Sequence, residues 1–345
     1  MLGNYYEAAS INATTTFALR AVNSWGSSPD GYVTVRVIDP LAFGVAITSP
    51  LAGDTISKPF ALVEGLVANG GAEVGVTVNG IPAQVVGNTF FVNNLSLTEG
   101  ENTLTAGATD PNGNSVQDSL TVTSNSTGKE WLELSLNPES GIADPTAIPA
   151  KPFTATLKVT PHLSNSSTAW GCDGFGYDYI GYGTSENPVT YASSYNGDCF
   201  EEPLLFSDPG IYKLHYSLTD VSVANGQNYT GEIWVNVLDK EGLDSVLRQQ
   251  WNNVKTAWAA HDVEGGLAYF AEGAKSHYRG ALNALVAELP QIVSEMQDIE
   301  LVSARGRYAE YRLNRLQNIN GTMVDMTYYI YFVKDHTGLW KVDQF

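Results

Sequence analysis

The sequence has little of the chemistry that marks common enzymes and nucleic-acid-binding proteins. Charged residues make up only 16% of the 345 residues, and 18 Lys and Arg stand against 37 Asp and Glu. The formal net charge of −19 repels nucleic-acid phosphates and anionic lipids, so we expect neither as a partner. No HExxH, CxxC, P-loop or Gly-x-Ser-x-Gly motif occurs, which removes the enzyme classes that these motifs identify.

Cysteines and long apolar runs are also scarce. The two cysteines, Cys172 and Cys199, fall in one predicted domain, and each is flanked by Gly and Asp. We expect a disulfide, which would stabilise the fold by about 3–4 kcal/mol on the loop-entropy estimate. Two free buried thiols are the alternative. No stretch is long and apolar enough to span a membrane, and we expect an extracellular or cell-surface location.

What is present favours a multidomain, mostly β protein. Hydrophobic residues reach 43%, and Gly, Ser, Thr and Asn are abundant, as in β-rich domains with many turns. The length predicts two to four domains. Residues 1–240 carry most of the negative charge, whereas residues 241–345 are nearly balanced. We therefore predict tandem Ig-like β-sandwiches over residues 1–40 (partial), 44–125 and 129–239, followed by an α+β domain over 241–345.

Residues 1–40 predict two strands joined by a turn. Residues 14–23 and 32–38 alternate apolar and polar side chains, and residues 24–31 are rich in Gly, Ser, Pro and Asp. Two strands alone are marginally stable in water. The pair resembles the last hairpin of a bacterial Ig-like or PKD-like module. It could pack on the next domain or accept strands from another chain.

Residues 44–125 predict the clearest sandwich. Short strands recur at regular spacing, and Asn79-Gly80 is a strong hairpin signal. Five further segments are typical of one kind of Ig-like module: Ile47-Thr48-Ser49-Pro50, Val76–Gly80, Leu97–Leu104, Ala108–Asp110 and Gly113-Asn114. On these residues the stretch resembles the bacterial Ig-like modules related to domain B of glucodextranase. The resemblance implies a spacer or an accessory module.

Residues 129–239 predict a second Ig-like sandwich. Residues 208–212, Asp-Pro-Gly-Ile-Tyr, resemble the tyrosine corner of such sandwiches, in which a Tyr hydroxyl ties the loop to the backbone. We interpret the segment around the two cysteines as a long loop or hairpin closed by the disulfide. Its aromatic side chains are candidates for binding a sugar or a protein, or they form a small core around the disulfide. They are Trp170, Tyr177, Tyr179, Tyr182 and Tyr195.

Residues 241–345 change from strand to helix patterns. Leu243, Leu247, Trp251, Val254 and Trp258 recur at spacings of three and four, which predicts an amphipathic helix. We expect further helices over 267–270 and 281–296, then strands over 299–303, 308–317, 323–333 and 339–345. The order, with residues 258–267 and 338–343, resembles the NTF2/SnoaL-like cone fold. That resemblance implies a fold and not one function.

The interior of such a cone is where a pocket is expected. Asp325, Tyr329 and Tyr331 share one face of a predicted strand, and an acid beside tyrosines could transfer protons. The alternative is structural, because His261-Asp262 fits a helix end. No catalytic pair of the family can be matched, so we assign no catalytic residue. The candidate pocket residues are His261, Tyr269, His277, Tyr278, Tyr311, Asp325, Tyr329 and Tyr331.

One turn is a candidate calcium site. Asp110, Asn112 and Asn114 alternate in a glycine-containing turn and offer oxygen ligands to Ca²⁺. No Glu follows at the far end, so the run is not an EF-hand, and an ordinary Asn/Asp/Gly turn explains the same residues. We expect no other cofactor.

These features predict a non-enzymatic protein of the cell surface. The Ig-like domains would form a stalk, and the C-terminal domain and the aromatic segment would bind a protein or polysaccharide partner or assemble into a fibre. In a fibre, the N-terminal strand pair would be completed by a neighbouring chain. The alternatives are an accessory carbohydrate-binding region of a secreted enzyme and a small-molecule enzyme built in the C-terminal domain.

Overall fold

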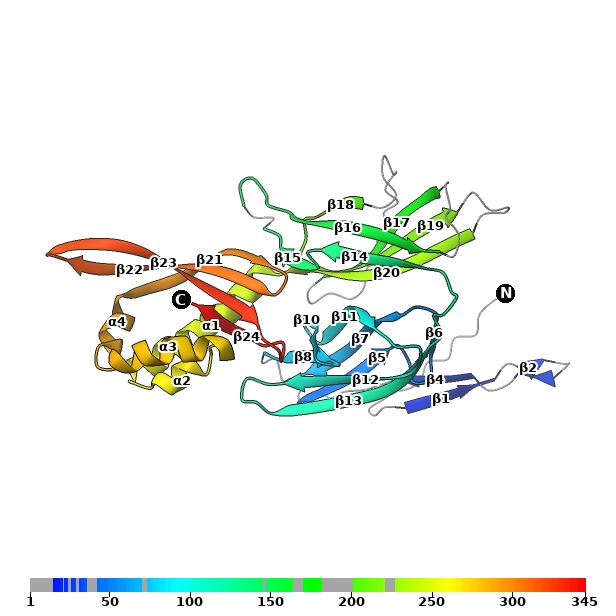
Figure 1. Cartoon of the computed structure of the whole chain (residues 1–345), viewed down its shortest axis with the longest axis horizontal. Coiled ribbons are helices and arrows are strands. Elements are labelled where there is room, and N and C mark those ends of the chain that lie inside the picture. Colours follow the sequence, from blue (N-terminus) through cyan, green and yellow to red (C-terminus); the bar gives the residue numbers. More distant parts are fainter. Residues whose placement is uncertain are drawn as a thin grey trace.

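Strands dominate the chain, and the helices are confined to residues 240–295 (Figure 1). The computed structural model describes residues 15–20, 22–23, 26–28, 31–35, 42–69, 73–144, 147–163, 170–181, 201–220 and 227–345. Within them the predicted mostly β class is confirmed. We refer to residues 44–124 as the first sandwich, to residues 131–238 as the second sandwich and to residues 240–345 as the C-terminal domain.

The N-terminal residues form the predicted strand pair. β1 (Thr15–Leu19) pairs antiparallel with β4 (Gly31–Val35), and β2 (Val22–Asn23) pairs with β3 (Gly26–Ser27) between them. The pair lies at the end of the molecule opposite the C-terminal helices (Figure 1).

The first sandwich packs two sheets over an aliphatic core. One sheet has the order β10-β11-β7-β5 and the other β6-β13-β12-β8-β9. The strands are β5 (Gly44–Ser49), β6 (Thr55–Ile56), β7 (Phe60–Ala68), β8 (Gly75–Val78), β9 (Ile81–Pro82), β10 (Gln84–Val86), β11 (Thr89–Ser96), β12 (Gly100–Thr109) and β13 (Ser115–Ser124). Asn79 and Gly80, with φ of 49° and 80°, form the predicted tight turn between β8 and β9.

The second sandwich also packs two sheets. Its strands are β14 (Trp131–Asn137), β15 (Ser140–Ile142), β16 (Phe153–His162), β17 (Trp170–Gly181), β18 (Glu201–Phe206), β19 (Gly210–Asp220) and β20 (Gln227–Leu238). Sheet β14-β16-β18 covers β17-β19-β20 with Leu157, Leu214 and Val235 in the core. The Tyr212 hydroxyl donates to the Asp208 carbonyl at 2.8 Å, which confirms the predicted tyrosine corner.

The C-terminal domain packs four helices on one face of an antiparallel sheet (Figure 1). The helices are α1 (Lys240–Ala259), α2 (Val263–Leu267), α3 (Glu272–Ala284) and α4 (Leu289–Glu295), and the strands are β21 (Met296–Arg305), β22 (Tyr308–Ile319), β23 (Thr322–Lys334) and β24 (Trp340–Gln344). The predicted third helix was wrong in extent. It is divided into α3 and α4, because the chain leaves helical geometry at Leu285 and Pro290 lies in the first turn of α4.

A short strand joins the second sandwich to the C-terminal domain. β15 pairs parallel with β20 and antiparallel with β21, so one eight-stranded sheet runs through both domains. Ser140 strengthens the junction. Its carbonyl accepts from the Gly306 N–H at 2.8 Å, and its hydroxyl donates to the Gly306 carbonyl at 2.9 Å. The two domains therefore share main-chain hydrogen bonds.

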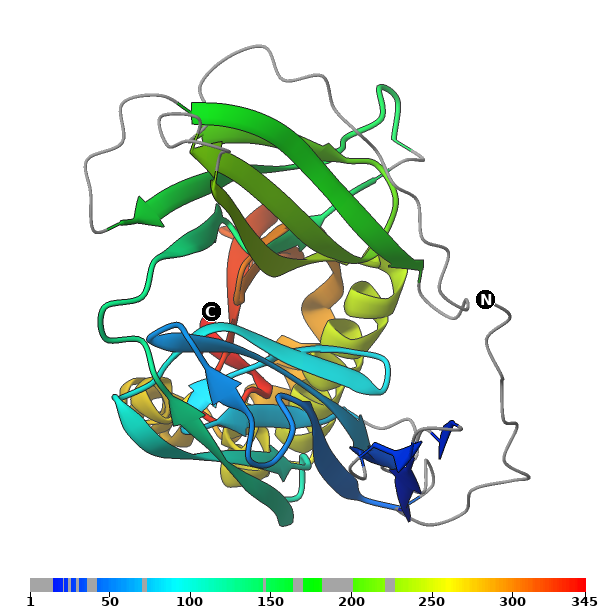
Figure 2. The same ribbon diagram turned by 90° about the vertical axis from the view of Figure 1, so that its right-hand side faces the viewer.

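The two sandwiches also dock side by side (Figure 2). The Asn93 side chain accepts from the Trp234 N–H at 3.0 Å and donates to the Trp234 carbonyl at 2.8 Å. The Trp234 ring stacks on Phe91 at 5.5 Å, and its indole N–H donates to Glu64 at 2.6 Å. A bulge in β11 after Val92 places Asn93 for this contact. The domains are packed against each other, which differs from a stalk of separate modules.

Candidate functional site

The C-terminal domain contains an apolar cavity of about 230 Å³ between the helices and the sheet, partly open to solvent. Its lining residues come from α1, α3 and the residue after it, α4, β21, β22, β23 and the C-terminal residue. They are Trp258, Leu282, Leu285, Leu289, Ile292, Met296, Leu313, Arg315, Tyr328 and Phe345. Arg315 donates to Glu295 from two nitrogens, at 2.6 and 3.0 Å. The cavity fits an apolar group and holds no acid–base pair among its lining residues.

Strand β23 turns the predicted Asp325, Tyr329 and Tyr331 away from this cavity. They do share one face, as predicted, but all three are exposed, at 48% for Tyr329 and 39% for Tyr331. The alternate residues Ile330 and Phe332 are fully buried against the helices. The expectation that the first three line a pocket was therefore wrong. The even-numbered residues of β23, which include Ile330 and Phe332, are the more apolar of the two alternating sets, and this difference in the sequence indicates which face is buried.

The predicted histidines are surface residues. His261 follows the C-terminal end of α1 with φ of 61°, is exposed, and its Nδ1 lies 2.7 Å from the Val286 carbonyl. Asp262 caps α2 by accepting from the Gly265 N–H at 2.8 Å, which confirms the structural alternative for this pair. His277 is exposed on α3 and contacts the Tyr278 ring edge-on at 5.0 Å. Neither histidine lines the cavity.

The remaining tyrosines of the predicted pocket pack in the core. Tyr269 is half-buried, and the Tyr278 hydroxyl accepts from the Phe345 N–H at 2.8 Å and donates to the Phe345 carbonyl at 3.0 Å. Tyr311 is fully buried against Phe332, and burial, with the nearby Asp244 carboxylate, raises the pKa of its hydroxyl. Tyr311 is thus kept protonated inside the core.

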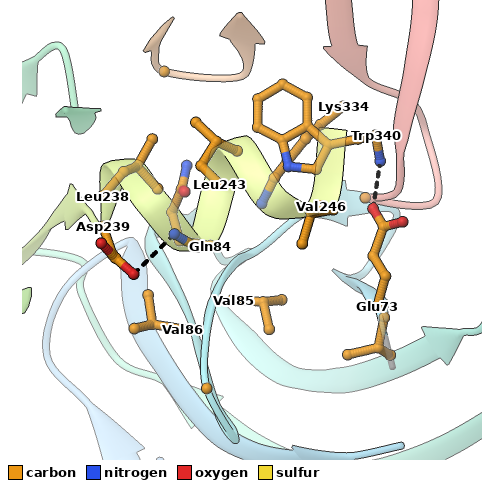
Figure 3. A pocket seen from close by; sticks show the side chains of 15 residues that line it. Glu73, Gln84, Val85, Val86, Leu238, Asp239, Leu243, Val246, Lys334 and Trp340 are labelled. Atoms are coloured by element: carbon orange, nitrogen blue, oxygen red, sulfur yellow. Dashed lines mark hydrogen bonds between the residues drawn. The ribbon is translucent and has the colours of Figure 1, made fainter. Parts of the chain in front are cut away.

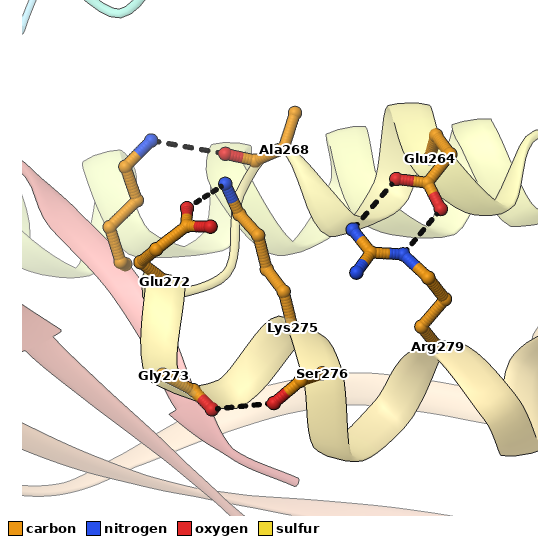
Figure 4. Close-up of polar contacts among 8 residues, drawn as sticks. Glu264, Ala268, Glu272, Gly273, Lys275, Ser276 and Arg279 are labelled. Atoms are coloured by element: carbon orange, nitrogen blue, oxygen red, sulfur yellow. Dashed lines mark hydrogen bonds and ion pairs between the residues drawn. The ribbon is translucent and has the colours of Figure 1, made fainter.

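The surface of α2 and α3 is held by ion pairs (Figure 4). The Arg279 guanidinium donates to both Glu264 oxygens, at 2.7 and 3.0 Å, and Lys275 donates to Glu272 at 2.7 Å. These hydrogen bonds lower the pKa of Glu264 and of Glu272. All four charges are satisfied by one another, which is the pattern of a stabilised helix surface.

The outer face of the C-terminal sheet collects exposed apolar side chains. Of the fourteen exposed large hydrophobic residues in the described part of the chain, eight lie on β21, β22 and β23. They are Val302, Tyr308, Leu316, Ile319, Met323, Met326, Tyr329 and Tyr331. Ile319 and Met326 belong to the inner face beyond the helices, whereas Tyr329 and Tyr331 lie opposite Arg312 and Glu310 on the outer face. Leu316 and Met323 were not predicted from the sequence, because single exposed apolar residues give no pattern.

The aromatic segment is described in part. Residues 170–181 form strand β17, paired along its length with β19, so this half of the predicted loop or hairpin is a strand of the sheet. Trp170, Cys172, Tyr177 and Tyr179 lie on it. Tyr182, Tyr195 and Cys199 lie outside the described residues. The Cys172–Cys199 disulfide and the binding role of the segment stay predictions.

The candidate calcium turn is held by its own hydrogen bonds. One Asp110 oxygen accepts from the N–H groups of Asn112 and Asn114, at 2.9 and 2.8 Å, and the other accepts from the Asn114 side chain at 2.8 Å. The Asn114 hydrogen bond is the main reason that the pKa of Asp110 is lowered. No group of three or more His, Cys, Asp or Glu among the described residues could hold a metal ion. Calcium at this turn stays a prediction.

Comparisons with known proteins support the Ig-like character of the first sandwich. Residues 44–126 match the family described as glucodextranase, domain B. This match confirms the resemblance that the sequence suggested for that segment. A search of curated proteins finds no match. None of the described helices is long and apolar enough to cross a membrane.

Several solved structures share parts of the arrangement at low similarity. The fibronectin(III)-like modules of Clostridium thermocellum CbhA are 13% identical, with 56% of this chain and 95% of that chain covered and a TM-score of 0.20. Protocadherin gamma B2 cadherin domains 1–5 are 14% identical, with 66% of this chain and 46% of that chain covered and a TM-score of 0.20. Dimeric latent PorU from Porphyromonas gingivalis is 13% identical, with 65% of this chain and 24% of that chain covered and a TM-score of 0.25. The chain spans less than half of the last two, and TM-scores this low assign neither overall architecture nor function.

Proposed function

We propose that this chain is a non-enzymatic, extracellular or cell-surface binding protein whose recognition surface is the outer face of the C-terminal sheet. The observation that carries the proposal is the concentration of exposed apolar and aromatic side chains on β21–β23. Soluble proteins rarely group such residues on one element unless a partner covers them.

The chemistry of this face suits a protein partner. Tyr329 and Tyr331 supply flat apolar area with a polar tip, and aromatic residues of this kind dominate the binding energy of interfaces. Beside them, Arg312 forms an ion pair with Glu300, and the Tyr331 hydroxyl lies 3.4 Å from Glu310. The face thus combines apolar anchors with charges of both signs, which also makes it suitable for contact with a second copy of the chain.

The rest of the fold holds this face at a fixed orientation. β15 connects the C-terminal sheet to the second sandwich, and Asn93 and Trp234 connect the two sandwiches. A recognition surface on a rigid support loses less conformational entropy when it binds. The Ig-like domains therefore act as a support for the binding face in this proposal.

The test is self-association measured by light scattering over a wide concentration range, with and without Ca²⁺. The test variant replaces Tyr329 and Tyr331 by Ser, and the matched control replaces Leu205 by Ser on β18 of the second sandwich, where the side chain is 68% exposed. We expect the molar mass of the wild type and of the control to rise with concentration, and that of the double variant to stay constant.

The other outcomes are equally informative. If the molar mass of the double variant still rises with concentration, the assembly surface lies elsewhere, and the N-terminal strand pair is the next candidate. A constant monomer mass for the wild type would contradict self-association. Retention on immobilised polysaccharide, lost in the double variant, would then favour the accessory carbohydrate-binding alternative.

A second candidate function rests on the cavity of about 230 Å³. We propose that the C-terminal domain is an NTF2/SnoaL-like cone, supported by its helices packed on a curved antiparallel sheet, and that the cavity binds a small apolar molecule. Its one charged lining residue, Arg315, is already paired with Glu295. Binding without catalysis is therefore the better interpretation. Leu313→Trp would fill part of the cavity, so catalytic turnover of a substrate that this substitution abolishes would contradict the interpretation.

A further inference from the structure

A second pocket lies where the three parts of the molecule meet (Figure 3). It measures about 320 Å³. The first sandwich contributes Glu73 and strand β10, the second sandwich contributes Leu238 at the end of β20, and the C-terminal domain contributes the first turns of α1, Lys334 and Trp340. The apolar walls are Val85, Val86, Leu238, Leu243, Val246 and Trp340. A molecule in this pocket would touch all three parts.

Lys334 is the unusual group of this pocket. It ends β23, is only 8% exposed, and its main chain is fixed by hydrogen bonds to Arg307 in both directions, at 2.9 and 3.1 Å. Its ammonium lies 5.6 Å from the centre of the Trp340 ring. Among the described residues, no hydrogen bond or ion pair of this ammonium is found. Burial of an ammonium without an acceptor is costly, so the pocket lacks an acceptor that a ligand could supply.

The two carboxylates that line the pocket are engaged elsewhere. Glu73 accepts from the Trp340 N–H at 3.0 Å and from the Gln250 side chain at 2.6 Å. Asp239 caps α1 by accepting from the N–H groups of Glu241 and Gly242, at 3.2 and 3.0 Å. Glu73 provides a nearby negative charge for Lys334, but its oxygens accept no hydrogen bond from the ammonium.

We infer that this junction pocket binds a small carboxylate with a short apolar body. The ligand carboxylate would accept hydrogen bonds from the Lys334 ammonium, and the apolar body would pack against the valine and leucine walls and the Trp340 ring. The volume is at the low end for ligand pockets, which favours a short body over a long acyl chain. Because the walls come from three parts of the chain, the ligand would bind their docked arrangement and stabilise it. The inference is independent of the proposed recognition face.

The test uses hexanoate as the probe and isothermal titration calorimetry on the full chain. Hexan-1-ol, which has the same apolar body without the carboxylate, is the control ligand. Lys334→Met removes the ammonium and keeps an apolar stem of similar length. Lys275→Met is the matched control, because Lys275 lies on α3 and pairs with Glu272 outside the pocket. We expect the wild type and Lys275→Met to bind one hexanoate with equal affinity, and Lys334→Met to bind it at least about tenfold more weakly, the loss of one charged hydrogen bond.

Three results would overturn the inference. They are no binding of hexanoate by the wild type, equal binding of hexanoate and hexan-1-ol, and unchanged affinity in Lys334→Met. Misfolding of Lys334→Met is not expected, since the variant removes a largely desolvated charge that faces the pocket, and its unfolding curve checks this directly. A spectral change of Trp340 on titration, absent in Trp340→Phe, would place the ligand in this pocket and not in the cavity of the C-terminal domain.

Discussion

Two lysines lie where parts of this molecule meet, and their surroundings differ. Lys213, on β19 between the sandwiches, lies 3.0 Å from Glu64 and 3.3 Å from Glu232. Burial disfavours its charge, but the two carboxylates outweigh burial and raise its pKa. Lys334, where all three parts meet, has no acceptor among the described residues, and burial lowers its pKa to about 8 despite the Glu73 charge.

The difference distinguishes a lysine whose charge is paired within the fold, Lys213, from one whose charge is free to pair with a ligand, Lys334. The carboxylates around Lys213 are supplied by the chain itself, so this contact needs nothing further. The chain desolvates Lys334 without supplying an acceptor, and a perturbed group that lies in a pocket is a candidate for a binding site. The comparison predicts that disruption of the first contact weakens the fold, whereas removal of the Lys334 charge strengthens it.

The largest effect is expected from breaking the contact between the sandwiches at Trp234. Trp234→Ala removes the stack on Phe91 and the hydrogen bond to Glu64, and leaves a cavity. The free energy of unfolding should fall by about 3–5 kcal/mol, measured by urea titration. The control is Leu205→Ala on β18, where the side chain is 68% exposed and the change should stay within about 0.5 kcal/mol. Equal losses in both variants would show that this contact does not hold the sandwiches.

Removal of the Lys334 charge is expected to act in the opposite direction. The folded-state pKa of about 8 lies below the usual lysine pKa of 10.5, so the folded protein releases this proton more readily. Stability from this group is therefore present above pH 10.5 and is lost as the pH falls through about 8. Lys334→Met should stabilise the protein at neutral pH by up to about 3 kcal/mol. The free energy of unfolding of the wild type should rise between pH 8 and pH 10, and Lys334→Met should flatten this rise. If the rise persists in the variant, Lys334 is not its source.

The features that sequence predicted are those with local causes. Asn79-Gly80 forms the predicted turn because its two residues adopt the positive φ that such turns require, and Asn320-Gly321 does the same between β22 and β23. The tyrosine corner spans only residues 208–212, and its hydroxyl contact lies within them. The amphipathic spacing of α1 identified Leu247, Trp251 and Trp258 as core residues correctly. In each case the determining interactions lie within one turn or one element.

The features that sequence did not predict depend on distant segments. Ser140 meets Gly306, and Glu73 meets Trp340 and Gln250, across separations that no periodicity records. The period of two placed Asp325, Tyr329 and Tyr331 on one face correctly. Which face is buried was decided by α1 to α4, which cover the other side of the sheet. The junction pocket could not be predicted, because its walls come from three domains.

The contact at Lys213 offers a matched substitution that sharpens the comparison. Lys213→Met leaves Glu64 and Glu232 without their shared cation, so the free energy of unfolding should fall by about 1.5 kcal/mol at neutral pH. Because its folded pKa is raised, the stability from Lys213 is present below pH 10.5 and is lost at higher pH. The loss caused by the substitution should therefore shrink in strongly alkaline solution. A gain in stability, as expected for Lys334→Met, would remove the distinction between the two lysines.

The smallest expected effect tests whether Glu73 is the one charge that supports Lys334. Glu73→Gln removes a carboxylate whose own pKa is raised, chiefly by burial, and keeps a side-chain oxygen for the Trp340 N–H. The substitution removes the attraction between Glu73 and Lys334, but it also removes the cost of burying a carboxylate. These two effects nearly cancel, so the free energy of unfolding at neutral pH should change by less than about 1 kcal/mol. The pKa of Lys334, followed by NMR of its labelled ε-carbon, should fall below the wild-type value because the favourable Glu73 charge is gone. Glu272→Gln, in the surface ion pair of Lys275, should leave that pKa unchanged. If Glu73→Gln also leaves it unchanged, another group must stabilise the Lys334 charge, and the junction pocket would then need no carboxylate from a ligand.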